Sequence, residues 1–300
     1  MSDTGRVPPP EARIAALIDD LEHGEAEWRM SAALALGRLG NAAVPGLIEV
    51  LRSGSAPARD AAGAAIGRIG RAARTVPQAL LELLDDPADE VRAGAARAIG
   101  TIGATAVPQL TKMLGHERSE VRRVAAQALG CLARDAEPAT AVLTSRLADT
   151  DLEVRQRAVW ALGKIGAPAI DGLRGALGDA DASVRVTAAR SLGAIGERAL
   201  PAEAELRRAL GDGDARVQIH AAVALTTLGV DATAAVPVLA DAIGDPDPEI
   251  RARAARALGR LGPASRAAAS ALLSALRDGV PEVRQAALEG AKKAYRDRMT

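Results

Sequence analysis

The amino-acid sequence predicts an all-α fold, in which about nine two-helix units stack into an α-solenoid. Three observations support this prediction: one phrase recurs along most of the chain, alanine holds the same position in every copy, and aromatic residues are nearly absent. A large single core usually contains bulky aromatic rings. A core of Ala, Leu, Val and Ile instead suits a thin stack, in which each unit packs only against its neighbours.

The recurring phrase is clearest in residues 245–262, DPDPEIRARAARALGRLG, and in residues 149–166, DTDLEVRQRAVWALGKIG. We number each copy from its anchor, the residue that follows Val or Ile in most copies. Successive anchors lie 30 or 33 residues apart, which is the period of a repeat protein with one supersecondary unit per copy. The nine anchors are Arg29, Arg59, Arg92, Arg122, Arg155, Arg185, Gln218, Arg251 and Arg284.

Each copy carries signals for two helices. The first helix begins near a proline, as at Pro45 and Pro108, where the missing N–H costs nothing. The second begins at an aspartate such as Asp247, whose side chain can cap the helix. It ends at a glycine such as Gly166 or Gly262, which can adopt the left-handed conformation that stops a helix.

The core face of the second helix follows from its spacing. Apolar residues one before the anchor and seven and ten after it form one stripe, with Trp28 expected in the core at the first of these positions. Alanine stands three residues after every anchor, which indicates a close contact with a neighbouring helix. These residues are Ala32, Ala62, Ala95, Ala125, Ala158, Ala188, Ala221, Ala254 and Ala287.

The motif DxDxxVRxxAAxALGxxG resembles HEAT repeats of the short type found in phycobilisome-lyase-like proteins, over roughly residues 11–295. The resemblance implies a right-handed α-solenoid over residues 11–300 as one domain, after a flexible segment 1–10. It also implies second helices that line a concave surface, and a ladder of Asp–Arg contacts that is weaker at His23, Ser53, His116 and Gln218. The expected ladder carboxylates are Asp86, Asp149, Asp179, Asp212, Asp245 and Asp278.

Composition sets limits on location and charge. The 38 basic residues equal the 38 acidic ones, so any electrostatic function must come from how charges are sorted between faces. One cysteine, Cys131, allows no intramolecular disulfide, and no signal peptide or membrane-spanning apolar run is recognised. We therefore expect a cytoplasmic monomer that makes no contact with a membrane.

Catalytic and metal-binding patterns are missing from the sequence. The three histidines are scattered, and only His116 precedes a glutamate, whereas repeat hydroxylases with two irons need several His-Glu steps. His116 is expected in an exposed turn, and one cysteine is too few for a zinc site. We expect no catalytic residue, metal or cofactor, although the bilin-lyase activity of some relatives remains an alternative.

The face opposite the core stripe is rich in cations. Among 27 residues at two, five and nine positions after the anchors, ten are basic and one is acidic. Cations at plus nine could instead serve the carbonyl end of the helix dipole. The aromatic ring of Trp160 could be a binding hot spot or could pack against a neighbouring helix. The predicted partner-binding residues are Trp160, Arg157, Lys164, Arg190, Arg97, Arg253, Arg256 and Arg260.

These features predict a non-catalytic interaction scaffold that binds an acidic or extended protein or peptide in a basic concave groove. Nucleic-acid binding is the alternative, because groove cations could also contact phosphates. The neutral overall charge and the single groove aromatic speak against it. A lyase-like enzyme is the third possibility.

Overall fold

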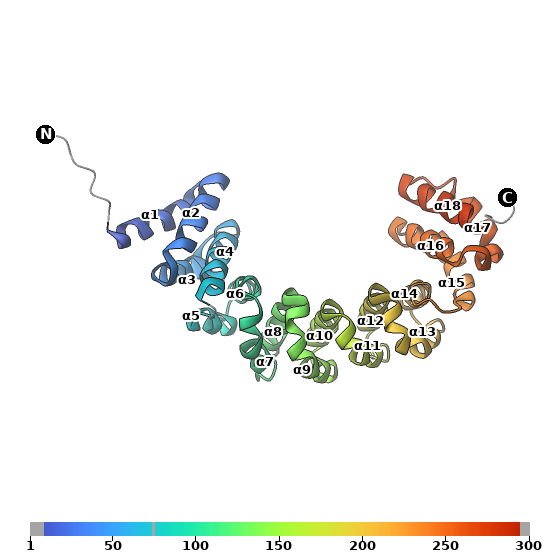
Figure 1. The fold of residues 1–300 in the computed structure, drawn as a ribbon, viewed down its shortest axis with the longest axis horizontal. Coiled ribbons are helices and arrows are strands. Elements are labelled where there is room, and N and C mark those ends of the chain that lie inside the picture. The colour runs from blue at the N-terminus through green and yellow to red at the C-terminus, as the bar shows by residue number, and fades with distance from the viewer. Residues whose placement is uncertain (1–8, 74–75, 295–300) are drawn as a thin grey trace. The chain divides into compact units, whose positions relative to one another are not determined.

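The computed structural model describes residues 9–73 and 76–294, and in these residues it contains helices and no strand. Eighteen α-helices, α1 to α18, follow one another as nine pairs (Figure 1). The all-α prediction and the nine two-helix units are therefore confirmed. Of the segment 1–10 that was predicted to be flexible, residues 1–8 lie outside the described residues, and Pro10 is the first residue of α1.

The chain divides into two compact units, Met1–Ala161 and Leu162–Thr300, and the division falls within α10. We call them unit 1 and unit 2. The prediction of one domain over residues 11–300 stays a prediction.

In unit 1, the second helices of the pairs pack side by side, and each first helix that precedes them packs on its own partner (Figure 1). The first helices are α1 (Pro10–His23), α3 (Val44–Ser53), α5 (Gln78–Glu82), α7 (Val107–Met113) and α9 (Thr140–Ser145). The second helices are α2 (Ala26–Leu39), α4 (Ala56–Ala73), α6 (Asp89–Ile102), α8 (Ser119–Leu132) and α10 (Leu152–Ile165).

Unit 2 repeats this arrangement, and its second helices lie on the inner side of the bend of its stack (Figure 1). The first helices are α11 (Ile170–Ala176), α13 (Glu203–Ala209), α15 (Val236–Asp241) and α17 (Ala269–Ala275). The second helices are α12 (Ala182–Ile195), α14 (Ala215–Leu225), α16 (Pro248–Leu261) and α18 (Pro281–Ala294). Short 3-10 segments join many of the helices.

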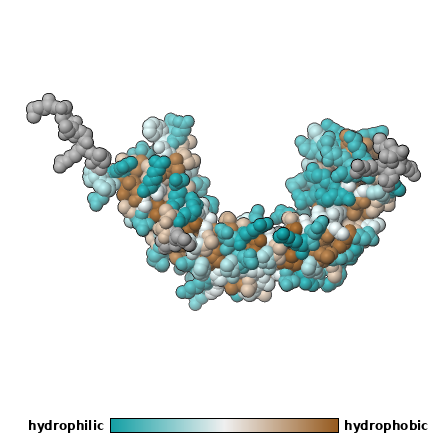
Figure 2. All heavy atoms as spheres, viewed as in Figure 1, coloured by the Kyte–Doolittle hydropathy of each residue, from teal (hydrophilic) through white to brown (hydrophobic). Residues whose placement is uncertain are grey.

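The predicted core stripe is buried. All nine alanines at plus three are at most 1% exposed, and the Leu or Ile side chains at plus seven, from Leu36 to Leu258, are fully buried. Figure 2 shows hydrophilic side chains over much of the visible face of each unit, with apolar patches between them. The small alanines let neighbouring helices approach closely, as the sequence indicates.

The prediction for Trp28 is wrong, because this side chain is 66% exposed. Other copies hold Ala, Val or Ile at the same position, as at Val91 and Val154, which are buried. A site of that size cannot take an indole without moving its neighbours, so the larger ring stays outside.

A glycine eight residues after the anchor marks the place where consecutive second helices meet. A Cβ on Gly193 of α12 would lie 3.1 Å from the Cα of Ala224 in α14, and a Cβ on Gly259 of α16 would lie 2.8 Å from the Cα of Gly290 in α18. Seven of the nine copies have this glycine: Gly37, Gly67, Gly100, Gly130, Gly163, Gly193 and Gly259. The first glycine of the ALGxxG phrase is thus a packing residue, which the sequence analysis did not recognise.

The Asp–Arg ladder is present in both units. In unit 2, Nε and Nη2 of Arg185 donate to the two carboxylate oxygens of Asp212 at 2.8 and 2.7 Å. Arg251 and Asp278 form the same paired contact, and Arg122 and Asp149 form it in unit 1. Each of these arginines also donates to the main-chain carbonyl six residues before it. The ladder therefore joins the turn of one copy to the turn of the next.

Where the predicted pattern is interrupted, the ladder changes. Arg92 has no aspartate at the position of His116, so it binds Asp89 within its own helix and is almost completely buried. Gln218 keeps the contact to the main-chain oxygen of Asp212, at 2.6 Å, but has no charge to offer the next copy. The predicted weakening at His116 and Gln218 is confirmed.

One segment corrects the expectation that no apolar run is long enough to cross a membrane. Among the residues that the structure describes, Ala26–Ser53 passes a test of length and mean hydropathy, with 28 residues and a value of 1.3. This segment is not one straight helix. α2 ends at Leu39, and the next residue, Gly40, has a φ of +70° and interrupts the helix before α3 begins. Its Leu36, Leu47 and Leu51 side chains are fully buried, so packing within unit 1 accounts for its apolar character.

Ala133 holds a strained position at the end of α8. Six other copies have a glycine there with φ between +54° and +100°, whereas Ala133 has a φ of +51°. An L-residue pays about 1–3 kcal/mol for such a conformation. Ala133→Gly is therefore expected to raise the free energy of unfolding by about 1 kcal/mol, because a glycine adopts this conformation without strain.

Urea denaturation followed by circular dichroism measures this effect. Ala64→Gly, in the exposed middle of α4, is the matched control and should lower the stability by up to about 1 kcal/mol. A loss of stability in both variants would contradict strain at Ala133.

Candidate anion-binding pocket

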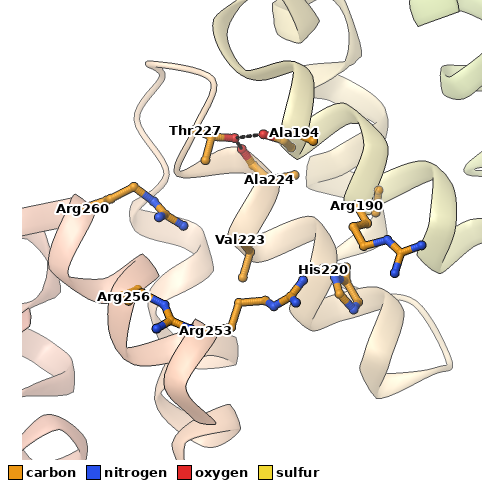
Figure 3. A pocket seen from close by; sticks show the side chains of 11 residues that line it. Arg190, Ala194, His220, Val223, Ala224, Thr227, Arg253, Arg256 and Arg260 are labelled. Atoms are coloured by element: carbon orange, nitrogen blue, oxygen red, sulfur yellow. Dashed lines mark hydrogen bonds between the residues drawn. The ribbon is translucent and has the colours of Figure 1, made fainter. Parts of the chain in front are cut away.

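Three consecutive second helices of unit 2 enclose a pocket of about 360 Å³ (Figure 3). Its charged and polar lining consists of Arg190 from α12, His220 from α14, and Arg253, Arg256 and Arg260 from α16, with Thr227 just beyond α14. These residues are at two, five or nine positions after an anchor. Four of the predicted partner-binding residues, Arg190, Arg253, Arg256 and Arg260, therefore line one pocket.

The floor of the pocket is held by close packing between α12 and α14. Gly193 allows the two backbones to meet at Ala224, and Oγ1 of Thr227 donates to the carbonyl oxygen of Gly193 at 3.0 Å (Figure 3). Ala189 and Val223 supply apolar surface between the charged groups. The aliphatic parts of the arginine side chains can lie on this apolar floor while their charged ends reach solvent.

The arginines differ in their partners. Nη2 of Arg253 is 2.6 Å from Oε1 of Glu249, one turn earlier in α16, and Nε of Arg260 donates to Oγ1 of Thr226 at 3.1 Å. Within the described part of the chain, Arg190, Arg256 and Arg260 have no carboxylate within ion-pair distance. The pocket therefore carries positive charge that the protein does not neutralise locally.

Burial and a neighbouring positive charge both act on Arg260. Desolvation, followed by the charge of Arg256, lowers the pKa of Arg260 from its ordinary value. An arginine nevertheless stays protonated at neutral pH, because its guanidinium pKa lies far above 7.

His220 is the one histidine that lines the pocket. Its side chain is 9% exposed, and burial, followed by the charges of Arg253 and Arg190, lowers its pKa to about 4. Glu249 opposes this shift, and Arg216 adds to it. No hydrogen bond to the imidazole ring is present among residues 9–73 and 76–294. At pH 7 the ring is neutral and has one N–H donor and one acceptor to offer a ligand.

Sequence reasoning placed His220 on the exposed face but did not select it as a site residue. The sequence feature that could have identified it is its position in the repeat. His220 stands two residues after the anchor Gln218, and the copies before and after it supply Arg190 and Arg253. A single histidine in a repeat is usually structural, and only the pocket shows that its ring lies among arginines (Figure 3).

The structure separates the other predicted residues from this pocket. Arg97 of α6 is in unit 1, where its Nη2 is 2.9 Å from Oδ1 of Asp60 in α4. Arg157 and Trp160 belong to unit 1, whereas Lys164 and Arg190 belong to unit 2. The roles of Arg97, Arg157, Trp160 and Lys164 in partner binding stay predictions.

Trp160 is half-buried and packs against α8. A Cβ on Gly130 would overlap its indole ring, so the absence of a side chain at Gly130 creates the space for the ring. Part of the Trp160 ring therefore packs against a neighbouring helix, which is the alternative considered for this residue. Arg157, three residues earlier, is exposed.

The remaining histidine, cysteine and acidic residues form no comparable cluster among the described residues. His116 lies in the connection between α7 and α8, but it is half-buried and not exposed as expected. It lines a hollow of about 600 Å³ together with Lys112 and Glu82. In the described residues, no three His, Cys, Asp or Glu side chains gather in a way that could hold a metal ion. Cys131 is exposed near the end of α8.

Two of these features, a stack of helix pairs and a pocket lined by arginines on successive second helices, define a helical-repeat protein with a basic pocket in unit 2. The sequence pattern of HEAT repeats matches residues 76–151, 140–204 and 203–292, and the pattern of the PBS lyase HEAT-like repeat matches residues 28–53. Because the first pattern covers more than half of the chain, the chain belongs to the HEAT-repeat family. No curated protein sequence matches the chain.

Solved structures show the same fold. A crystal structure of an engineered protein is 25% identical, with a TM-score of 0.54, over 96% of this chain and 92% of that protein. A crystal structure of a Kap121p mutant is 14% identical, with a TM-score of 0.52, over 100% of this chain and 40% of that protein. Both are similar in the stacking of their helices, which is what such identities can show.

Proposed function

We propose that the chain is a non-catalytic interaction scaffold that binds an acidic segment of a partner protein at the basic pocket of unit 2. The observation that carries this proposal is that Arg190, Arg256 and Arg260 line one pocket and have no carboxylate partner among the described residues. Exposed positive charge that is not paired within the protein favours an acidic ligand. HEAT repeats supply the scaffold, since the stack presents the same face of successive helices.

A protein partner fits these observations better than a nucleic acid does. The chain has a net charge of zero, whereas nucleic-acid-binding domains are usually strongly basic. The arginines also surround a pocket that can take one or a few acidic side chains.

The proposal is tested with a fluorescein-labelled peptide rich in Asp and Glu, whose binding is followed by fluorescence anisotropy. Arg190→Glu/Arg256→Glu is expected to weaken binding at least about tenfold, because each charge-assisted hydrogen bond is worth about 1.5–3 kcal/mol. The matched control is Arg198→Glu/Arg277→Glu, which changes the net charge equally at exposed residues outside the pocket.

Three results would sink the proposal: no binding to the wild type, an equal loss of affinity in both double variants, or tighter binding of a DNA duplex than of the peptide. The last result would instead favour the nucleic-acid alternative. Circular dichroism of each variant checks that the helices are retained.

A further inference from the structure

The basic pocket holds more unpaired positive charge than one carboxylate can neutralise. Arg190 approaches from α12, and Arg256 and Arg260 approach from α16 (Figure 3). Arg253 also points its guanidinium toward His220, although it forms an ion pair with Glu249 (Figure 3). A ligand in the pocket is therefore surrounded by donors from two sides, with α14 as the floor between them.

This arrangement suits a tetrahedral dianion better than a planar monoanion. Guanidinium groups bind phosphate oxygens in paired contacts, and a phosphorylated side chain offers three acceptor oxygens and a charge of about −1.5 to −2 at pH 7. A carboxylate offers two oxygens in one plane and a single charge. The guanidinium of Arg253 lies beside the ring of His220, so donors from α16 and α14 can contact different oxygens of one phosphate (Figure 3).

We propose that the pocket lined by Arg190, His220, Arg253, Arg256 and Arg260 binds a phosphate dianion on a phosphorylated serine or threonine side chain of the partner segment. This inference rests on the proposed function, because it names the chemistry by which the acidic segment is recognised. The apolar surface of Ala189, Ala194 and Val223 contacts the aliphatic part of that side chain. A volume of about 360 Å³ lies at the lower end of ligand pockets, which fits one such group and its neighbours.

His220 gives the pocket an element that a scattered group of surface arginines lacks. His220 is 9% exposed, lines the pocket, and has no hydrogen-bond partner for its ring among the described residues. Its N–H can donate to a phosphate oxygen. The charged groups that act on it are Arg190 from α12, Arg216 on α14, and Arg253 and Glu249 from α16. A bound dianion offsets the arginine charges, so its binding favours protonation of the ring.

The test compares three labelled peptides that share one acidic sequence and differ at a central serine, which is unmodified, phosphorylated or replaced by glutamate. Fluorescence anisotropy is expected to show the phosphoserine peptide bound at least about tenfold more tightly than the glutamate peptide, because additional charge-assisted hydrogen bonds form. Arg190→Gln/Arg256→Gln should remove this difference. Arg198→Gln/Arg277→Gln, outside the pocket, should retain it.

Competition with inorganic phosphate identifies the source of the phosphate group. Free phosphate should displace the phosphoserine peptide only at concentrations far above the peptide's own dissociation constant. Displacement at a similar concentration would overturn the assignment to a phosphorylated segment. Equal affinity for the glutamate and phosphoserine peptides, with loss in the pocket variant, would overturn the phosphate inference and leave the acidic-partner proposal intact. Failure of all three peptides to bind would overturn both.

Discussion

Replacing Arg185 with glutamine is expected to lower the free energy of unfolding by about 2–3 kcal/mol, somewhat less than the roughly 3–5 kcal/mol lost when a fully buried ion pair is broken. The Arg185 and Asp212 side chains are only 16% and 12% exposed. Glutamine can keep the contact to the main-chain oxygen of Asp179, as Gln218 does in the next copy with Asp212. It leaves the Asp212 carboxylate without its guanidinium partner.

The measurement is urea denaturation of the wild type, Arg185→Gln, Asp212→Asn and the double variant. The double-variant cycle should show a favourable coupling between the two side chains, because each single change breaks the same contact. Arg198→Gln is the control and should change the stability by less than about 0.5 kcal/mol, since Arg198 is exposed. Equal stability of Arg185→Gln and Arg198→Gln would contradict a structural role for the ladder.

The ladder also has a pH signature. The hydrogen bonds from Arg185 lower the pKa of Asp212 below its ordinary value, although burial opposes this effect. The folded state therefore binds fewer protons than the unfolded state in the acid range. The stabilisation by this pair is complete above the ordinary aspartate pKa, near 4, and is lost as the pH falls through the lowered folded-state pKa.

Replacing His220 with glutamine is expected to remove a loss of stability of roughly 3 kcal/mol that the wild type undergoes on acidification from pH 7 to pH 4. The folded-state pKa of His220 is about 4, whereas its ordinary value is 6.5. Between these values the unfolded chain binds the proton more readily, so acidification favours unfolding. Urea denaturation at intervals over this pH range measures the slope.

His23→Gln is the control for this prediction. His23 is exposed at the end of α1 and lies outside the pocket. The stability of His23→Gln should therefore depend on pH as steeply as that of the wild type. A slope of the same size in His220→Gln and in the wild type would show that other groups cause the acid sensitivity.

The fold could be predicted from the sequence because each copy encodes it locally. The spacing of 30 or 33 residues, the alanine at plus three and the capping residues such as Asp247 all appear in short stretches of chain. Asp247 indeed accepts a hydrogen bond from the N–H of Glu249. Trp28 and Ala133 escaped prediction, because the size of a packing site and the sign of a φ angle depend on the neighbouring structure.

The candidate site was predictable in part. Helical spacing placed Arg190, Arg253, Arg256 and Arg260 on one exposed face, since side chains three and four residues apart share a face. The spacing could not show that α12, α14 and α16 enclose a pocket, that His220 lies within it, or that Asp60 neutralises Arg97. These features depend on how closely successive second helices approach, which is decided by contacts such as that of Gly193 with Ala224.

Nuclear magnetic resonance of the histidine side chains tests the central claim most directly, because the chain has only three histidines and one of them lines the pocket. The labelled protein is titrated with the acidic peptide, and the Cε1–H signals of His23, His116 and His220 are followed. We expect the His220 signal to shift in proportion to the bound fraction while the other two signals stay in place. A peptide that binds with an unchanged His220 signal, or with shifts at His23 or His116 alone, would contradict binding at this pocket.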